Sequence, residues 1–307
     1  MELERHRVEL TGYCYRMLGS GFEAEDAVQE TMVRAWRSFD RFDSTKSALR
    51  SWLYTIATNV CFDMLRSAQR RARAMDLHPA SPAGAALGAP LPESVWVQPV
   101  PDRRVLADDP AAIATQRETI RLAFVAALQL LAPRQRAVLI LRDVLCWTAD
   151  EVAGLLATTV PSVNSALQRA RKTLNDTTLR PAEPADDQQR ELLARYATAF
   201  EEYDIETLVS LLHEDATMSM PPFPWWLNGR DEIRTVLEAA GRPCEGSRLV
   251  PTRANGSPAF WQYRDDDLFA LVVLEIRDLM ITEVTTFLDA PRLVPLFADE
   301  FPAAVPY

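Results

Sequence analysis

The sequence has no pair of closely spaced cysteines. The four cysteines, Cys14, Cys61, Cys146 and Cys244, lie far apart in the chain. This spacing predicts neither a disulfide framework nor a cysteine-based zinc site. We therefore expect reduced and mostly buried thiols, no bound metal and no cofactor.

The chain also lacks a long hydrophobic run. Its best apolar stretch, residues 268–276, is too short to cross a bilayer and contains Glu275. The charged N-terminus, MELERHRVEL, has no hydrophobic core of the kind that signal peptides carry. We therefore expect a cytoplasmic protein that makes no contact with a membrane.

Acidic charge is concentrated in the last third of the chain. The formal net charge is −10, yet residues 181–307 alone carry 23 acidic and 10 basic side chains. Residues 1–75 carry 12 basic and 10 acidic side chains, and residues 100–180 carry 11 basic and 8 acidic ones. The first two thirds are therefore mildly positive, which suits contact with phosphates.

Residues 147–174 predict two short helices separated by a tight break. Thr148 and Glu151 have the spacing of a capping box, which predicts that the first helix starts there. A break at residues 157–159 precedes the second helix, which has Pro161 in its first turn. The apolar positions of the second helix form one buried stripe, namely Val160, Val163, Leu167, Ala170 and Leu174.

The second helix carries polar and cationic residues on its other faces, namely Ser162, Asn164, Ser165, Gln168, Arg169, Arg171 and Lys172. This arrangement is typical of a helix-turn-helix, in which the start of the second helix reads base edges and cations hold phosphates. The alternative is a helical hairpin with a solvated polar face, whose cations complement the helix dipole.

The first 75 residues are also predicted to be helical. Residues 21–42 have apolar side chains at helical spacing and acidic residues in the first turns, as the helix dipole prefers. Residues 47–74 combine aromatic side chains with a basic end, which suits unstacked bases and a single-stranded backbone. Alternatively, Trp52 and Phe62 simply belong to the core.

Two long segments resemble a known family. The stretches AEDAVQETMVRAW (24–36) and SWLYTIATNVCFDMLR (51–66) resemble region 2 of the extracytoplasmic-function sigma factors of the sigma-70 family. Residues 128–174 resemble region 4 of the same family. The resemblance implies a subunit of RNA polymerase that directs promoter recognition and transcription initiation and is not an enzyme. It also implies core RNA polymerase (the beta and beta-prime subunits) and promoter DNA as partners.

The resemblance assigns roles to individual residues. Binding to core polymerase is implied for Asp26, Gln29, Glu30 and Arg34. Reading of the minus-10 element is implied for Trp52, Tyr54, Asn59, Asp63 and Arg66, with Asn59 at the loop that captures a flipped base. Reading of the minus-35 element is implied for the polar residues of the second helix, from Ser162 to Lys172. Many members of the family have arginine where this chain has Asn164 and Ala166, so their promoter sequence does not transfer. Asn and Gln would favour adenine if they reach a base edge.

A proline- and alanine-rich stretch separates the two regions. Residues 76–112 predict an extended linker rather than a packed unit. Trp96 is unusual in such a segment, and we expect it to dock on another domain rather than make only a local contact. The resulting organisation is region 2 at 1–75, the linker, region 4 at 113–180, a third domain at 188–290 and a tail at 291–307.

In the third domain, predicted helices are followed by predicted strands. Asn255-Gly256 between extended runs predicts a hairpin, and helices followed by antiparallel strands indicate an α+β fold. The order of elements resembles the SnoaL-like branch of the NTF2-like cone fold, which encloses an apolar cavity. The residues that could line this cavity are Met218, Met220, Phe223, Trp225, Trp226, Trp261 and Tyr263. An unknown small ligand that binds in the cavity is therefore a further candidate partner. The alternative is a filled core or a domain interface.

Three functions compete for this chain. A sigma factor whose third domain modulates its activity in cis is the interpretation we favour. A one-component, ligand-sensing regulator and a DNA-tethered enzyme are the alternatives, but neither explains the first 75 residues. An enzyme of this fold needs a buried acid–base pair, for which the candidates are Asp204, His213, Asp215 and Asp289. Capping in a turn at a helix end is the commoner explanation for His213 and Asp215.

Overall fold

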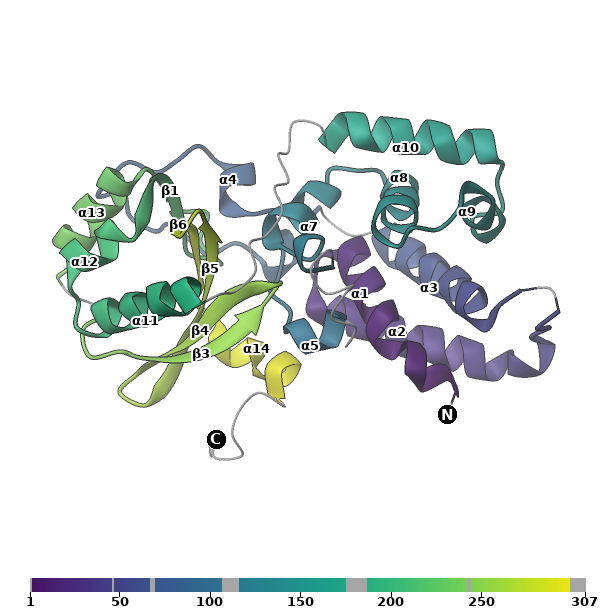
Figure 1. Ribbon diagram of the computed structural model, residues 1–307, viewed down its shortest axis with the longest axis horizontal. Coiled ribbons are helices and arrows are strands. Elements are labelled where there is room, and N and C mark those ends of the chain that lie inside the picture. Colours follow the sequence, from purple (N-terminus) through teal and green to yellow (C-terminus); the bar gives the residue numbers. More distant parts are fainter. Residues whose placement is uncertain are drawn as a thin grey trace. The chain divides into compact units, whose positions relative to one another are not determined.

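The computed structural model describes residues 2–45, 47–66, 70–106, 116–174, 187–241 and 244–298 (Figure 1). The chain forms two compact units, and neither is continuous in sequence. The first unit combines residues 1–71 with 97–181, and the second combines residues 72–96 with 182–307. The predicted fold class is confirmed, because helical domains are followed by a mixed-sheet domain. The domain boundaries expected near residues 112 and 180 lie outside the described residues.

The described part of the first unit is helical. Its N-terminal part contains η1 (Glu2–His6), α1 (Arg7–Leu18), α2 (Gly21–Arg37), η2 (Phe39–Arg41) and α3 (Leu49–Leu65). Its second part contains α5 (Asp102–Val105), α7 (Leu122–Leu128), α8 (Pro133–Leu139), η4 (Ile140–Val144), α9 (Ala149–Leu155) and α10 (Val160–Leu174). Helix α2 begins where it does because the Ser20 hydroxyl accepts a hydrogen bond from the Glu23 amide at 3.3 Å.

The helix-turn-helix has the caps and the buried stripe that the sequence predicts. The Thr148 hydroxyl accepts from the Glu151 amide, and the Glu151 carboxylate accepts from the Thr148 amide at 2.7 Å. The chain turns at Ala157, which has a φ of 47°, before α10 begins. The buried residues of α10 are Val163, Leu167, Ala170 and Leu174, while Val160, which was also expected in the stripe, is half-buried at the start of the helix. Its polar face is therefore left outward.

Helices α1 and α3 pack against residues 116–147 within the first unit. The ring centroids of Tyr54 and Trp147 lie 5.0 Å apart. Two buried arginines bond to carbonyl oxygens of the opposite part: Arg16 donates to Thr119, and Arg136 donates to Met17. Burial lowers the pKa of each of these two guanidinium groups to about 10, because removal from water disfavours the charged form.

The second unit contains a six-stranded sheet in the order β2-β1-β6-β5-β4-β3. Its strands are β1 (Leu212–Ser219), β2 (Trp226–Asn228), β3 (Arg248–Ala254), β4 (Ser257–Arg264), β5 (Asp267–Arg277) and β6 (Met280–Phe287). Strands β1 and β6 are parallel, and the other neighbours are antiparallel. The predicted hairpin at Asn255-Gly256 is confirmed, because both residues have positive φ and connect β3 to β4.

Helices cover both faces of this sheet. On one face, α11 (Asp187–Glu201), α12 (Ile205–Ser210) and α13 (Arg230–Ala239) pack with strand residues such as Phe260 and Val272. On the opposite face, α14 (Ala290–Phe297) places Phe297 edge-on to Trp261, with ring centroids 5.0 Å apart. The expectation of a tail from residue 291 is therefore wrong as far as residue 297, since the apolar side of α14 is buried. Residues 299–307 lie outside the described residues.

Residues 72–96, which we call the strap, pack into the second unit. They contain α4 (Ala74–Leu77) and η3 (Glu93–Val95), and their ends meet where the Ala72 amide donates to the Val95 carbonyl at 2.7 Å. The expected extended, unpacked linker is therefore wrong for this segment. The local composition gives no sign of the packing, because the partners of the strap lie more than 120 residues further along the chain. Trp96 is buried beside Val95 and Trp226, so its expected docking on another domain is confirmed.

Candidate polymerase-binding and DNA-binding surfaces

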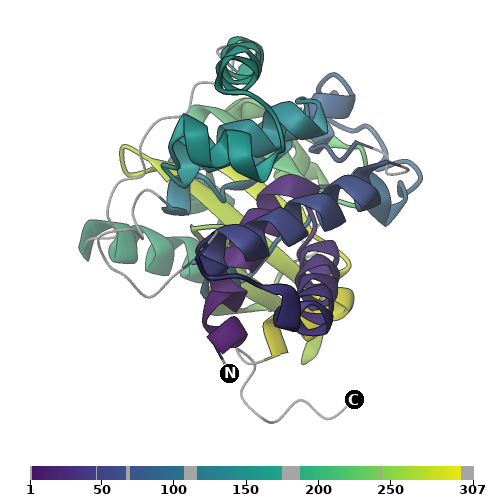
Figure 2. The same ribbon diagram turned by 90° about the vertical axis from the view of Figure 1, so that its right-hand side faces the viewer.

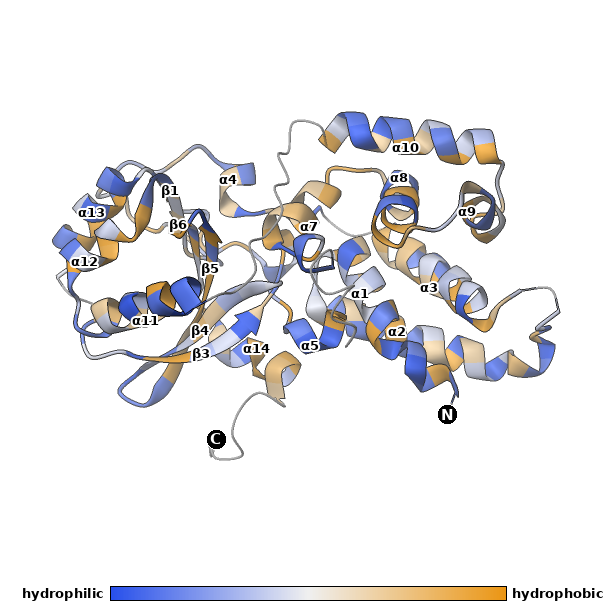
Figure 3. Cartoon of the chain, in the orientation of Figure 1, coloured by the Kyte–Doolittle hydropathy of each residue, from blue (hydrophilic) through white to orange (hydrophobic). Residues whose placement is uncertain are grey.

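Helix α10 presents its predicted polar residues on the sides that its buried stripe leaves open. Figure 2 shows α10 end-on above α8, and Figure 3 shows that its outward side is largely hydrophilic. Ser162, Asn164 and Gln168 are exposed, and Ser165 is half-buried. The structure thus brings together the groups that can read base edges, at the N-terminal half of one helix.

The cations of α10 have different surroundings. Arg169 donates to the Ser165 hydroxyl at 2.6 Å, one turn back on the same helix. Arg171 donates from two nitrogens to the two carboxylate oxygens of Asp143, at 2.7 and 2.9 Å. The hydrogen bond to Asp143 raises the pKa of Arg171. Lys172 is exposed.

The predicted polymerase-binding residues of α2 share a surface with part of the predicted minus-10 set. Asp26 and Gln29 are exposed, and Arg34 pairs with Glu30 at 2.6 Å and with Asp63 of α3 at 3.6 Å. The hydrogen bond to Glu30 is the main cause of the raised pKa of Arg34. The polar ends of α2 and α3 therefore form one continuous charged surface.

Helix α3 divides the minus-10 set. Asn59, Asp63 and Arg66 are exposed, so they can contact a ligand. The expectation that Asn59 lies at a loop is wrong, because it lies within α3. Trp52 is half-buried and packs against Phe42, with ring centroids 5.0 Å apart.

Tyr54 has no exposed surface. Its ring packs on Tyr13 and Trp147, and burial raises the pKa of its hydroxyl far above the usual value. In this structure Tyr54 is part of the core, so its assignment as a DNA contact is corrected.

Sequence reasoning missed one prominent residue at this surface. Trp36, on α2, leaves 72 % of its side chain exposed, and Phe39, just after the helix, is 40 % exposed. Helical spacing gives a signal for Trp36, because it lies seven residues, or about two turns, after the exposed Gln29. A large apolar ring left in water next to a polar surface suggests a protein interface.

The predicted cavity residues do not form one set. Trp225 belongs to the core cluster on the face of the sheet that α11, α12 and α13 cover. Met218, Met220 and Phe223 pack against that cluster. Trp261 points to the opposite face, against α14, and Tyr263 lies under the guanidinium of Arg248, which is 4.4 Å from its ring centroid. Trp226 packs in the separate cluster that contains the strap. The prediction of a single cavity lined by all seven residues is therefore corrected.

The candidate acid–base residues are structural or exposed. Asp204 caps α12 by accepting from the Thr207 amide. The hydrogen bond from the Thr207 hydroxyl, followed by the one from the amide, lowers the pKa of its carboxyl group. His213 and Asp215 lie on strand β1 rather than in a helix-end turn, and His213 Nδ1 accepts from the Asp215 amide at 3.1 Å. Asp289 is exposed just before α14. Nothing brings these four residues into one buried acid–base pair within the described ranges.

The described part of the chain has two further negative features. It contains no group of three or more His, Cys, Asp or Glu side chains placed to hold a metal ion. None of its helices combines the length and hydropathy that a bilayer crossing requires.

Family models match three segments of the chain. The Sigma-70 region 2 model matches residues 3–71, the Sigma-70 region 4 model matches residues 121–174, and the SnoaL-like domain model matches residues 193–281. The crystal structure of the Mycobacterium tuberculosis extracytoplasmic function sigma factor SigJ has the same fold, with a TM-score of 0.64 at 22 % identity. That likeness covers 95 % of this chain and 97 % of SigJ.

Curated relatives match over most of the length. The ECF RNA polymerase sigma factor SigG of Mycobacterium tuberculosis is 43 % identical over 309 residues, which cover 96 % of this chain and 82 % of SigG. SigJ of the same organism is 31 % identical over 218 residues, which cover 71 % of this chain and 63 % of SigJ. The chain therefore belongs to the ECF RNA polymerase sigma factors, which are transcription regulators that bind core RNA polymerase and promoter DNA.

Proposed function

We propose that this chain reads a minus-35 element with α10 and a minus-10 element with the exposed end of α3. The observation that carries the proposal is the exposure of Ser162, Asn164 and Gln168 on a helix that packs along one buried stripe. Such side chains can donate to and accept from base edges in a major groove. Asn59, exposed in the C-terminal half of α3, supplies the hydrogen-bonding group for the second element.

Core polymerase binds the surface of α2 that carries Asp26, Gln29, Glu30 and Arg34, with Trp36 as its anchor. Buried tryptophans dominate the free energy of many protein interfaces, with losses of about 2 kcal/mol or more on truncation. Trp36 is exposed in the free chain, so a partner can bury it without unfolding anything. The ion pairs of Arg34 hold the surrounding polar side chains in place.

Trp36→Ala tests this surface. We expect an affinity for purified core RNA polymerase about thirtyfold lower, the factor that about 2 kcal/mol gives. Displacement of a labelled wild-type chain from the core enzyme measures it. Leu130→Ala is the matched control, because Leu130 is an exposed apolar residue outside α2 and α3. Equal affinities for wild type and Trp36→Ala would contradict the assignment.

The C-terminal domain modulates this activity in cis by holding the strap. Trp226 donates from its ring nitrogen to the His78 carbonyl at 2.8 Å, and its own carbonyl accepts from the Ser81 amide. The Leu91 amide donates to the Pro222 carbonyl at 2.8 Å. Ala85 and Leu87 pack against the apolar core of the same domain. A segment that connects the two sigma regions thus belongs to the fold of the third domain.

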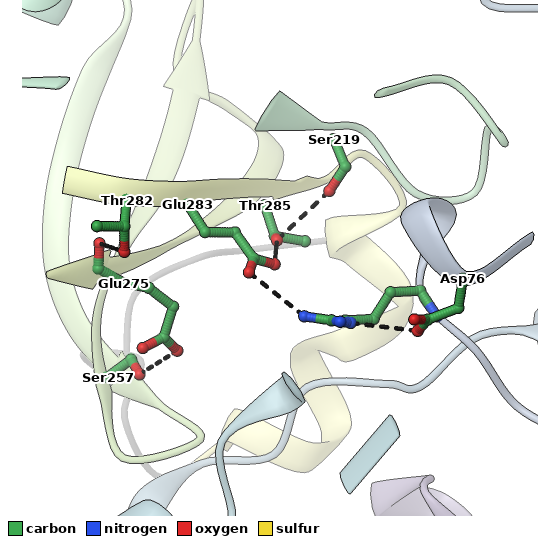
Figure 4. A network of polar contacts seen from close by, with 8 residues as sticks. Asp76, Ser219, Ser257, Glu275, Thr282, Glu283 and Thr285 are labelled. Carbon is green, nitrogen blue, oxygen red and sulfur yellow. Dashed lines mark hydrogen bonds and ion pairs between the residues drawn. The ribbon is translucent and has the colours of Figure 1, made fainter. Parts of the chain in front are cut away.

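Arg73 is the main charged anchor of the strap. Its guanidinium pairs with Glu283 of β6 at 3.4 Å and with Asp76 of α4 at 3.2 Å. Thr285 donates to Glu283 at 3.1 Å, and Figure 4 shows these two side chains with Asp76 opposite them. Burial lowers the pKa of Arg73, but the charges of Glu283 and Asp76 outweigh this and raise it. Near the other end of the strap, Arg292 pairs with Glu93.

Docking of the strap constrains the sigma regions because both of its ends continue into the first unit. Just before it, Arg71 pairs with Glu23 at 2.6 Å, and just after it, the Gln98 amide donates to the Gly19 carbonyl at 3.0 Å. The docked strap has adjoining ends, whereas a free chain of this length could extend to about 85 Å. Binding or release of the strap therefore changes how the C-terminal domain is tethered to region 2.

Arg73→Gln in the full chain tests the regulation. We expect faster amide hydrogen exchange at Ser81 and Leu91, and a change of about fivefold in transcription with core polymerase, the factor that about 1 kcal/mol gives. Arg234→Gln is the matched control, since it removes an ion pair of the same unit, with Glu206, that involves no residue of the strap. Faster exchange with unchanged transcription would overturn the regulatory role of the strap.

A further inference from the structure

The recognition helix has cations on two different sides of its buried stripe. Successive residues of a helix are rotated by about 100°, so Arg171 lies on one flank of the buried stripe, on the side that also carries Asn164 and Gln168. Arg169 and Lys172 lie further round the helix, toward the outward side that Ser162 and Ser165 share. The position of Arg171 on the flank of the buried stripe brings its guanidinium within reach of the scaffold on which α10 packs.

The scaffold supplies such a contact at Asp143. Nε of Arg171 donates to Oδ2 of Asp143 at 2.9 Å, and Nη2 donates to Oδ1 at 2.7 Å. This two-pronged geometry fixes both the direction and the rotation of the guanidinium plane. Asp143 is 29 % exposed and Arg171 is 58 % exposed, so the carboxylate is the more enclosed partner of the pair.

Asp143 stands on a rigid element. It belongs to η4, a single π-helical turn whose Ile140 and Leu141 are fully buried. The Trp147 amide donates to the Leu141 carbonyl at 2.9 Å, and the neighbouring Arg142 donates to the Trp147 carbonyl. A carboxylate held in this way can set the rotation of α10 about its own axis.

We propose that Asp143 is a positioning residue for the recognition helix, holding Arg171 away from the DNA backbone and fixing which residues of α10 face the bases. The proposal rests on the proposed minus-35 role of α10. It reassigns Arg171 from DNA contact to scaffold contact and leaves Arg169 and Lys172 as the phosphate-binding cations. Among the described residues, neither of these two has a carboxylate partner.

The salt dependence of binding separates the two roles of an arginine. Each phosphate neutralised by a protein cation contributes about −0.9 to the slope of log K against log salt on duplex DNA. An arginine already paired with a carboxylate of its own protein contributes little to this slope. Loss of that carboxylate would release the arginine to bind a phosphate.

The experiment uses holoenzyme formed from the full chain and core polymerase, on a duplex promoter that it transcribes. We expect Arg169→Gln to make the slope shallower by about 0.9 and Arg171→Gln to leave it unchanged. We expect Asp143→Asn to make it steeper by about 0.9, and the double variant Asp143→Asn, Arg171→Gln to return it to the wild-type value. Arg169→Gln is the matched control, because it removes the same charge from the same helix.

A second measurement tests positioning. Asp143→Asn and Arg171→Gln should both reduce the preference for the promoter over a version with a substituted minus-35 element, because both free the rotation of α10. A shallower slope for Arg171→Gln, equal to that of Arg169→Gln, would overturn the proposal, as would unchanged preference in both variants. Wild-type holoenzyme that ignores the minus-35 substitution would instead overturn the proposed role of α10 itself.

Discussion

Helices α3 and α10 are both expected to contact DNA. The sequence of α10 predicts which of its side chains are exposed, whereas the sequence of α3 does so only in part. Helix α10 is buried along one stripe, and every residue of that stripe was identifiable from its spacing. Helix α3 is buried on several sides, with Leu53, Tyr54 and Val60 all in the core. The apolar pattern of an amphipathic helix predicts which of its faces is exposed. The apolar pattern of a helix with several packing partners does not.

The difference explains why the resemblance to a family misassigned only some residues. On α10 the expected residues are exposed or half-buried, while on α3 the expected set includes the fully buried Tyr54. The partner of Tyr54 is Trp147, almost a hundred residues later in the chain. Only the tertiary structure could show that this aromatic residue packs on protein.

Replacement of Tyr54 tests the contrast between the two helices most strongly. Tyr54→Ala should lower the free energy of unfolding by about 3–5 kcal/mol, because it removes a large buried ring. Asn59→Ala, on the exposed side of the same helix, should leave stability within about 0.5 kcal/mol while lowering transcription. Urea unfolding monitored by circular dichroism measures the stabilities. A loss below about 1 kcal/mol for Tyr54→Ala would contradict the buried position.

Replacement of Gln168 tests base reading by α10. Gln168→Ala should reduce discrimination at one base pair of the minus-35 element by about 1–3 kcal/mol, with unchanged stability. Binding of holoenzyme to a set of singly substituted promoters measures this. Lys172→Gln should instead weaken binding to all of them equally. A uniform loss for Gln168→Ala would argue against contact between this residue and a base.

Removal of the capping box tests how much the Thr148 cap stabilises α9. Thr148→Ala should lower the free energy of unfolding by about 1 kcal/mol, since it leaves the Glu151 amide without its partner. Thermal unfolding measures the change, with Thr158→Ala as a control in the turn between α9 and α10. No difference between the two variants would show that the cap does not stabilise α9.

The same cap predicts a small pH dependence. Hydrogen bonds from the Thr148 amide and hydroxyl lower the pKa of Glu151 below the usual value of 4.5 for a glutamate. The ionised carboxylate therefore contributes stability above pH 4.5, and this contribution is lost as the pH falls through the folded-state pKa. Wild type should lose more stability than Glu151→Gln between pH 5 and 3, as measured by urea unfolding. Parallel losses would contradict the contribution of the ionised cap.

Much of the remaining fold was predictable from local patterns, and the exceptions have physical reasons. The Asn255-Gly256 hairpin follows from turn chemistry. The composition of the strap predicts a free linker. Its packing could not be predicted from the local sequence, because its hydrogen-bond partners, such as Pro222 and Trp226, are distant in sequence. The cavity set mixed two faces of the sheet, although strand alternation already separates Trp261 from Phe260.

Transcription with purified core RNA polymerase on pooled genomic promoters, with and without this chain, tests the central claim most directly. We expect new start sites that share upstream elements, and we expect these sites to be lost when Gln168 and Asn59 are both replaced by alanine. Start sites that persist unchanged in that double variant would contradict the assignment of promoter reading to α10 and the end of α3.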